Sequence, residues 1–557
     1  MKGFIFFFTA YLFMANLNSQ DMKTAFINGK IFTVNENQPL AESVISENGK
    51  IIFVGSNIEA NSFIDDKTKV IDLQGKLMLP GFNDAHLHFI SGGFYLLGID
   101  LRPAKSLTEF QEILMKYISI NEGRWITGGR WDHESWTEKM LPRKEDIDPF
   151  SQTTPIFVSR IDGHVGLANS LALKLAGITS DTKNPEGGLI EKDPVTGEPT
   201  GILKDNAMDL IFKIIPEKTF VENSDALARS LEEAKRLGIT SVNDITEKDQ
   251  VEVYQKFDEL KKLTCRVYSI YPISDYEDLI ADSIQAGSGN NFLMRGGLKA
   301  FSDGSLGAST AWFFEHYQQD TTVFGLPNDI VLNGKLEVWA IDADANKLQL
   351  CTHAIGDKAN SFMLNLYEKI ANSNPFWDRR FRIEHAQHLR EVDIHRFAKL
   401  GVIASVQPYH CIDDGVWAEK RIGKDRLKFT HAYRTFLNDR VTLAFGTDWP
   451  VAPLNPLLGI YAAVTRRTLD GQNPGGWIPE QKISVEEAIK CYTLNSAYAS
   501  FQEKIKGSIE VGKLADLIVL SDDILTIDPI KIKDAKIEMT IFNGVIIYQD
   551  TLTQTER

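Results

Sequence analysis

The sequence predicts an α/β protein built on a (β/α)₈ TIM barrel, with a composite β-sandwich-like domain from both termini and an insertion after the first barrel strand. Strand-and-turn patterns occur at both ends of the chain, and between them apolar runs alternate with amphipathic helical patterns. One long segment near the start of this middle region breaks the alternation. Alternating strands and helices build parallel sheets, and such a long series of strands favours a closed barrel over an open sheet.

The 557 residues carry 60 basic and 75 acidic side chains, which gives a formal net charge of −15 at pH 7. At roughly 150 residues per domain, this length allows about three or four domains, or one large barrel with additions. The acidic balance excludes a global electrostatic attraction to nucleic acid or to an anionic membrane, although not a local basic patch. The 4 cysteines show no CxxC spacing and therefore indicate neither a zinc ribbon nor a disulfide framework.

The first 20 residues have the layout of a secretory signal peptide. Lys2 supplies a positive start, and the nearly unbroken apolar run over 3–15 is short for a membrane span. A buried N-terminal strand or helix is the alternative interpretation. We expect residues 1–20 to be removed on export to the periplasm or the extracellular space, and we expect no membrane association after processing.

Both ends of the chain are predicted to contribute to one small β-domain. Residues 24–77 form short apolar runs separated by turns, among them the Asn48-Gly49 hairpin pattern. The same pattern returns near the C-terminus, where Asn543-Gly544 separates two apolar runs. We therefore predict a composite domain of residues 21–77 plus 505–557, with two unrelated hairpins as the alternative.

Residues 78–504 are predicted to form the barrel. Amphipathic helical patterns lie between many of its candidate strands. The segment from about 92 to 221 does not fit this alternation and is predicted to be an insertion after the first strand. The candidate buried strands are 78–82, 239–243, 265–271, 297–301, 348–352, 381–384, 402–407 and 441–446.

Potential metal ligands occur at the ends of these strands. His86 and His88 are two residues apart on an extended segment, so their side chains project to the same side. His353, His385 and Asp448 end three later strands. The carboxyl ends of parallel barrel strands meet at one face, so these five side chains should converge there. Imidazole with carboxylate suits zinc, iron, nickel or manganese, although each residue taken singly could be structural.

Lys299 lies in a predicted buried strand between Leu298 and Ala300. An ammonium group buried there is costly unless it is paired or neutralised. Reaction with carbon dioxide would give an anionic carbamate, whose oxygens could bridge two divalent ions around a shared hydroxide. The alternative is a lysine that reaches water or pairs with Asp303.

Several motifs, in this order along the chain, resemble the amidohydrolase superfamily: HxH after LPGF, KAFSDGSLG, THAIGD, RIEHAQ and GTDWPV. They are most similar to its amidohydrolase-3 branch, the YtcJ-like and N-substituted-formamide-deformylase-like metal-dependent hydrolases. The similarity extends over nearly the whole chain, including GRWDHESW and DGHVGLANS in the insertion.

The resemblance implies a barrel with one or two divalent ions, zinc being the expected metal. His86 and His88 would hold the first ion, with Asp448 completing that site. His353 and His385 would hold the second ion, and carboxylated Lys299 would bridge the pair.

The same residues predict a hydrolase that cleaves an amide-type C–N bond of a small molecule with metal-activated water. Asp448 would take the proton of the attacking water and deliver it to the departing nitrogen. By resemblance, His164 is a candidate oxyanion donor or substrate contact, with a structural role as the alternative. Trp131 and Asp132 are candidate pocket residues, for which ordinary packing is the alternative.

Other functions are compatible with the same ligands. A deaminase or an ester or lactone hydrolase could use this metal set, and a catalytically silent barrel could act as a binding protein. The sequence does not identify the substrate. Of the histidines without a role, His388 and His410 are expected nearest the site. Large barrels commonly form symmetric dimers, so a homodimer is one expectation and the oligomeric state stays open.

Overall fold

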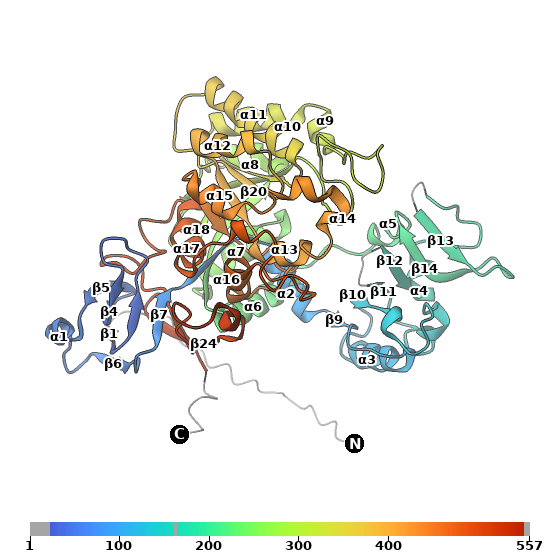
Figure 1. Cartoon of the computed structure of the whole chain (residues 1–557). Coiled ribbons are helices and arrows are strands. Elements are labelled where there is room, and N and C mark those ends of the chain that lie inside the picture. Colours follow the sequence, from blue (N-terminus) through green and yellow to red (C-terminus); the bar gives the residue numbers. More distant parts are fainter. Residues whose placement is uncertain (1–22, 161–163, 186–187, 551–557) are drawn as a thin grey trace, which may run out of the picture. The chain divides into compact units, whose positions relative to one another are not determined.

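A computed structural model describes residues 23–160, 164–185 and 188–550 (Figure 1). The signal peptide predicted over residues 1–20 lies outside the described residues. Among the helices of the described part, none is long and apolar enough to cross a membrane. The chain divides into two compact units, one formed by Met1–Phe89 with Leu231–Arg557 and the other by Ile90–Ser230.

The main sheet of the first unit is a nearly closed parallel barrel of eight strands, which confirms the predicted fold class. In spatial order these strands are β8 (Phe82–Leu87), β15 (Ile239–Ile245), β16 (Arg266–Pro272), β18 (Leu293–Phe301), β19 (Gln349–Ala354), β20 (Arg382–His385), β21 (Ile403–Val406) and β22 (Leu443–Phe445). Two backbone hydrogen bonds join the segment after β22 to β8: Asp448 N donates to His86 O at 2.7 Å, and His88 N donates to Trp449 O at 2.8 Å. A short additional strand, β17 (Ser288–Gly289), pairs antiparallel with β18.

The prediction for the first barrel strand, 78–82, was wrong. Residues Leu77–Pro80 form β7, which pairs with β23 (Leu517–Leu520) and β2 (Lys30–Phe32) outside the barrel. The apolar run over 77–82 contains all of β7 and only the first residue of β8, and Gly81 lies between the two strands. A Cβ on Gly81 would lie 2.2 Å from Thr240 Oγ1, so only glycine permits this close approach. His86 consequently lies within the barrel strand β8 and not after it.

Helices connect the barrel strands. Helix α12 (Glu391–Leu400) ends where Gly401 adopts φ = 66°, the left-handed conformation expected of a glycine stop. Helix α11 (Asp357–Ser373) buries one apolar face and packs beside α12 (Figure 1). The other main helices of this unit are α7 (Val251–Glu259), α8 (Tyr276–Ala281), α10 (Lys335–Ala345), α13 (Pro408–Asp414), α15 (Tyr433–Asn438), α16 (Pro456–Thr465), α17 (Val485–Cys491) and α18 (Leu494–Ala499).

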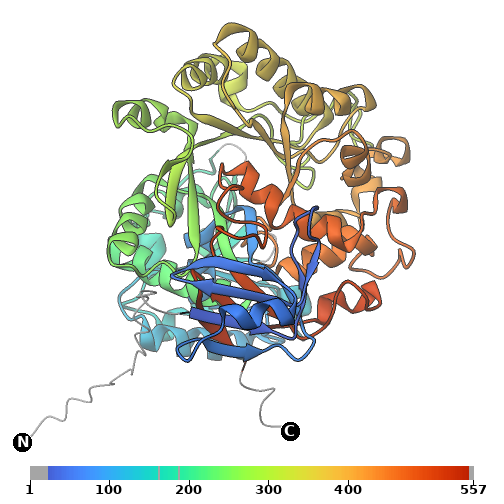
Figure 2. The ribbon, with the colours of Figure 1, turned by 90° about the vertical axis from the view of Figure 1, so that its left-hand side faces the viewer.

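The first unit has two further sheets, and one of them combines strands from both chain ends, as predicted. One has the order β5 (Lys50–Gly55), β4 (Ser43–Glu47), β1 (Lys23–Ile27), β6 (Lys69–Asp72), and the other β25 (Val545–Gln549), β24 (Ile537–Phe542), β23, β7, β2, β3 (Leu40–Ala41). N-terminal and C-terminal strands lie side by side in the second sheet (Figure 2). Phe26, Val44, Leu517 and Ile541 share one buried cluster, and burial of each such side chain contributes about 1.5–3 kcal/mol.

The second unit is built on a six-stranded mixed sheet. Its order is β13 (Gly188–Lys192), β14 (Pro199–Asp205), β12 (Val165–Ala168), β11 (Ile156–Arg160), β10 (Ile126–Trp131), β9 (Ile99–Asp100). Helix α3 (Leu107–Ile120) contributes Phe110 and Leu114 to a core that also contains Trp131 and Trp136. Helix α6 (Phe220–Arg236) leads from this unit back to the barrel.

Candidate metal centre

Three of the predicted ligands come together where β8 and β22 end. His86 Nε2 lies 3.6 Å and His88 Nε2 lies 3.5 Å from the same atom, Asp448 Oδ1. One ligand atom from each residue lies within 4.8 Å of the others. Tetrahedral donors about 2.1 Å from a zinc ion are roughly 3.4 Å apart, so this spacing is close to that of a ligand set around one ion.

A second group of three possible metal ligands has Asp448 in common with the first group. His385 is the last residue of β20, and His410 lies in the first turn of α13. Their ligand atoms and one from Asp448 again lie within 4.8 Å of one another. His410 Nε2 is 3.9 Å from Asp448 Oδ2. Within the described part of the chain, neither set contains His353, although its ring centroid is only 4.5 Å from that of His385.

In three imidazoles, one ring nitrogen is hydrogen-bonded to an acceptor of the protein, and the other nitrogen is left able to bind a metal. His86 Nδ1 lies 2.6 Å from Glu384 Oε2, and His385 Nδ1 lies 2.7 Å from Gln407 Oε1. His353 Nε2 lies 3.0 Å from the Gly304 carbonyl oxygen. Each acceptor fixes the proton on the facing nitrogen and leaves a lone pair on the other. Burial and the nearby Lys299 charge lower the pKa of His86 to about 4, which favours the neutral imidazole.

Glu384 is the buried acceptor beneath His86. Arg382 Nε donates to Glu384 Oε1 at 2.8 Å, and the Arg382 guanidinium also reaches Asn243 Oδ1 and Ser405 Oγ. Burial opposes ionisation, but Arg382 and His86 hold the pKa of Glu384 far below its usual range. Sequence reasoning missed this pair, although two charged residues in a predicted buried strand were a usable indication.

Asp84 attaches β8 to the loop that carries Asp448. It accepts hydrogen bonds from Thr447 N at 3.0 Å, Thr447 Oγ1 at 2.6 Å and His86 N at 3.1 Å. Two of the candidate ligands have left-handed backbones, with φ = 59° at Asp448 and φ = 73° at His385. Such conformations cost on the order of 1–3 kcal/mol each and are concentrated at functional sites. The surrounding hydrogen bonds hold Asp448 in this conformation.

Burial also opposes ionisation of Asp448, yet its carboxyl group is held as an anion. The hydrogen-bonding His88 and the imidazoles of His86 and His385 keep its pKa far below its ordinary value. An ionised carboxylate is both a ligand and a proton acceptor.

Lys299 is buried on β18, and burial lowers the pKa of its amine. Within the described residues its Nζ makes no hydrogen bond or ion pair, and it lies 4.7 Å from the centroid of the Phe301 ring. Pairing with Asp303 does not occur, because that carboxylate accepts from the backbone N–H groups of Ile355, Gly356 and Trp312.

The three residues predicted from the insertion lie in the second unit and make local contacts. Trp131 is fully buried, and its Nε1 donates to the Val158 carbonyl oxygen at 2.9 Å. Asp132 accepts from Glu134 N at 3.2 Å and from Arg160 Nη2 at 3.4 Å. His164 Nδ1 lies 2.9 Å from Asp205 Oδ1, and its side chain is 68% exposed. These contacts correspond to packing, turn formation and a surface pair.

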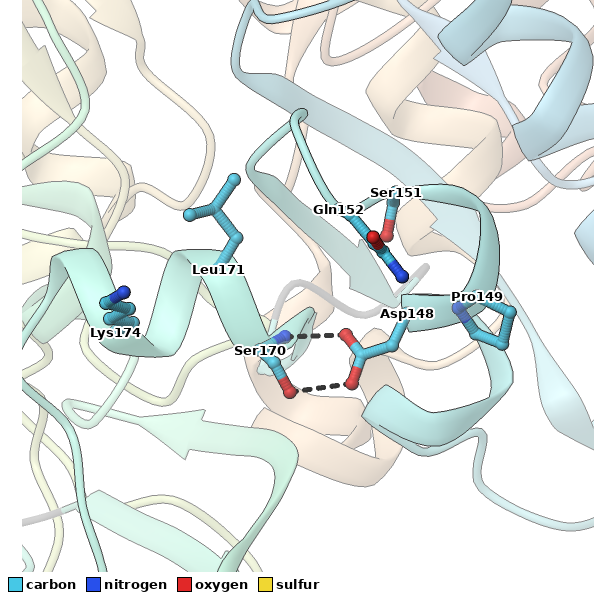
Figure 3. A pocket seen from close by; sticks show the side chains of 7 residues that line it. All are labelled: Asp148, Pro149, Ser151, Gln152, Ser170, Leu171 and Lys174. Carbon is cyan, nitrogen blue, oxygen red and sulfur yellow. Dashed lines mark hydrogen bonds between the residues drawn. The ribbon is translucent and has the colours of Figure 1, made fainter.

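A hollow of about 470 Å³ in the second unit contains no comparable set of ligands (Figure 3). The carboxylate of Asp148 accepts from Ser170 N at 2.8 Å and from Ser170 Oγ at 2.6 Å, so it caps the start of α4 (Ser170–Leu175). The remaining lining residues are Pro149, Ser151, Gln152, Leu171 and Lys174. The strand ends of the barrel therefore hold the candidate centre.

Comparisons with known sequences and structures identify the family of this chain. A sequence profile of the amidohydrolase family matches residues 69–548. The protein LONG AFTER FAR-RED 3 of Arabidopsis thaliana is 40% identical over 89% of this chain and 86% of its own length. The putative amidohydrolase YtcJ of Bacillus subtilis is 33% identical, over 95% of this chain and its whole length. The N-substituted formamide deformylase of Arthrobacter pascens is 27% identical over 94% of this chain and 98% of its own length.

Among solved structures, an uncharacterised metal-dependent hydrolase from Pyrococcus horikoshii superposes with a TM-score of 0.78 and 28% identity. The superposition covers 91% of this chain and 99% of the other. The superposed hydrolase has the same barrel fold. The chain belongs to the amidohydrolase family of metal-dependent hydrolases.

Proposed function

We propose that this hydrolase cleaves an amide-type C–N bond of a small molecule, with Asp448 as the proton carrier. The observation that carries the proposal is the position of the buried Asp448 carboxylate, between His86 and His88 on one side and His410 on the other. Full-length similarity to an N-substituted formamide deformylase supports an amide-type substrate.

The residues present fit divalent ions, because neutral imidazoles and a carboxylate are ligands that zinc accepts. His86 and His88 would hold one ion together with Asp448, and His385 would be a ligand of a second ion. When bound, such ions supply hydroxide from water near neutral pH and polarise the substrate carbonyl. We propose zinc as the metal.

Lys299 is proposed to carry a carbamate. Its depressed pKa favours the free amine, which is the form that attacks carbon dioxide. The new C–N bond forms as the neutral amine releases one proton to water, and the side chain becomes an anion that can bind two ions. The buried position without a hydrogen-bonding partner among the described residues supports this modification.

In the proposed reaction the water oxygen bonds to the substrate carbonyl carbon, and Asp448 takes the proton that the water loses. The C–N bond then breaks, and Asp448 returns the proton to the departing nitrogen. The first transfer requires an ionised carboxylate at rest, which agrees with the lowered pKa of Asp448. The second transfer uses the carboxylic acid that the first one forms.

The test is a substrate screen with the zinc-loaded protein and the same protein after chelation. N-substituted formamides, N-acyl amino acids and a cyclic amide should release an amine or acid, and chelation should abolish the reaction. Esters, lactones and an aminopurine are included as rival substrates. Cleavage of esters or lactones alone, or release of ammonia from the aminopurine alone, would contradict the proposal.

We also propose that the enzyme is exported after removal of residues 1–20. The positive start and the apolar run of this segment support export. N-terminal sequencing of the protein recovered from an exporting host would test the processing, and an intact Met1 on exported protein would contradict it.

A further inference from the structure

Phe301 is an exposed aromatic residue at the carboxyl end of a barrel strand. It is the last residue of β18, and it is 43% exposed, whereas Lys299 and Ala300 before it are buried. Side chains two apart on a strand point to the same side, so Phe301 points to the same side as Lys299 and lies nearer the mouth of the barrel. The exposed surface of the Phe301 ring therefore faces the opening in which barrel enzymes bind their substrates.

The ring of Phe301 lies against side chains of the candidate metal centre. Its centroid is 4.7 Å from Lys299 Nζ and 5.3 Å from the centroid of the His353 ring. The His353 ring in turn lies 4.5 Å from the ring of His385, which ends β20. One part of the Phe301 ring is thus in contact with the centre, and the exposed part is available to a molecule bound beside it.

Hydrogen bonds of the backbone fix the position of Phe301. The residue pairs with His353 in the parallel ladder between β18 and β19. The next residue, Ser302, donates to the His353 carbonyl oxygen from its N at 3.0 Å and from its Oγ at 2.6 Å. The Ser302 carbonyl oxygen accepts from Asn328 N at 2.9 Å. A ring on a rigid backbone loses little further freedom when a ligand packs on it, so it is suited to a binding surface.

The order of the strands indicates which part of a substrate would reach Phe301. β18 is the fourth and β22 the eighth of the eight barrel strands, so in the nearly closed barrel they lie opposite each other. Asp448, the proposed proton carrier, follows β22. Because Asp448 would deliver its proton to the departing nitrogen, that nitrogen would lie on the β22 side of the carbonyl carbon. The acyl substituent, on the other side of this carbon, would then point towards β18 and Phe301.

We propose that Phe301 is a specificity-determining residue and that the amide substrate carries an aromatic or large apolar acyl group, which packs on its ring. Two aromatic rings attract each other when their centroids are about 4.5–7 Å apart, in addition to the gain from removing both from water. The inference rests on the proposed amide hydrolysis and names the side of the amide bond that is recognised. A phenylacetyl amide should therefore be a better substrate than the acetyl amide of the same amine.

The first test compares N-methylphenylacetamide with N-methylacetamide, which both release methylamine, on the zinc-loaded protein. Wild type should have a kcat/KM roughly 10–100-fold higher for the phenylacetyl amide. Phe301→Ala should lose most of this preference, and Phe301→Leu, which keeps an apolar side chain, should retain part of it. The ratio of the two rates is informative even if a variant binds less metal or folds less completely, because both substrates meet the same preparation.

The matched control is Phe376→Ala. Phe376 is 93% exposed and lies between α11 and β20, at the amino ends of the barrel strands. This face of a barrel is opposite the one that binds substrates, so the control should keep the wild-type ratio of the two amides. An undiminished ratio in Phe301→Ala, or a wild type that prefers the acetyl amide, would overturn the inference.

A binding measurement decides the inference even if neither amide is cleaved. Phenylacetate and acetate, the acids that the two amides would release, are titrated calorimetrically into the zinc-loaded proteins. Wild type and Phe376→Ala should bind phenylacetate on the order of tenfold more tightly than acetate, and Phe301→Ala should bind the two acids about equally. Equal binding of both acids by wild type would overturn the inference. A preference that depends on Phe301, found without cleavage of any amide, would contradict only the proposed reaction. Cleavage of both amides with one ratio in all variants would contradict only this inference.

Discussion

Asp448 contacts His86 twice, through its backbone and through its side chain. Its N–H donates to the His86 carbonyl oxygen at 2.7 Å, and its Oδ1 lies 3.6 Å from His86 Nε2. The first contact joins the last barrel strand to the first, and the second places a carboxylate beside an imidazole. Closing the barrel and assembling the candidate metal centre therefore depend on the same pair of residues.

Replacing Asp448 by Asn should lower kcat by roughly 10²–10⁴-fold, because an amide cannot accept and return the proton. The backbone hydrogen bond to His86 does not depend on the side chain, so the fold should persist. Steady-state kinetics on an amide substrate should be measured together with ion content and a thermal melt. A variant with full ion content that keeps most of its kcat would exclude the proton-carrier role.

Lys299→Ala should bind about half the metal of the wild type, because the variant lacks the anion proposed to bridge two ions. Short carboxylic acids added to this variant should restore part of the activity by occupying the vacated position. Metal analysis and a titration with formate or acetate would check both results. Full occupancy by two ions in Lys299→Ala would show that Lys299 is not the bridge.

The strand pattern could be predicted because buried parallel strands are short apolar runs with helical patterns between them. The prediction of the first barrel strand failed because the apolar run over 77–82 contains β7 of the terminal sheet and reaches the first residue of β8 in the barrel. Periodicity alone cannot divide such a run, since both strands are buried on both faces. The division depends on the close approach of Gly81 to Thr240.

At the site, the sequence indicated the ligands at strand ends and placed His410 near them without a role, but it did not indicate Glu384. His410 lies beyond β21 in a helical turn, so its distance from Asp448 depends on how α13 starts after Gln407. Glu384 immediately precedes His385, and adjacent strand residues point to opposite sides. Its contact with His86 required the three-dimensional arrangement of β8 and β20.

Glu384→Gln should lower the free energy of unfolding by about 3–5 kcal/mol, because it leaves the Arg382 guanidinium buried without its counter-charge. Urea denaturation of the metal-free protein is the measurement. The matched control is Glu337→Gln, whose partner Lys369 is on the surface, and it should change stability by less than about 1 kcal/mol. Equal effects of the two substitutions would contradict the role given to the buried pair.

Lys506 provides a test of pH-dependent stability away from the proposed ligands. It is buried, and burial together with the neighbouring Arg266 charge lowers its pKa to about 7. The unfolded chain should keep the ordinary lysine pKa of about 10.4. Between these values the unfolded state binds more protons than the folded state, so the cost of burying this amine falls and the free energy of unfolding increases as the pH rises from 7.

Lys506→Met should remove this pH dependence while retaining most of the side-chain volume. The variant should be more stable than the wild type at pH 7, and its advantage should shrink on the order of 2–4 kcal/mol between pH 7 and 10. Urea denaturation of both metal-free proteins at several pH values gives the comparison. The exposed Lys248, paired with Asp278 on the surface, is the control, and Lys248→Met should follow the wild-type pH profile closely. Parallel profiles for wild type and Lys506→Met would mean that the buried amine does not titrate in this range.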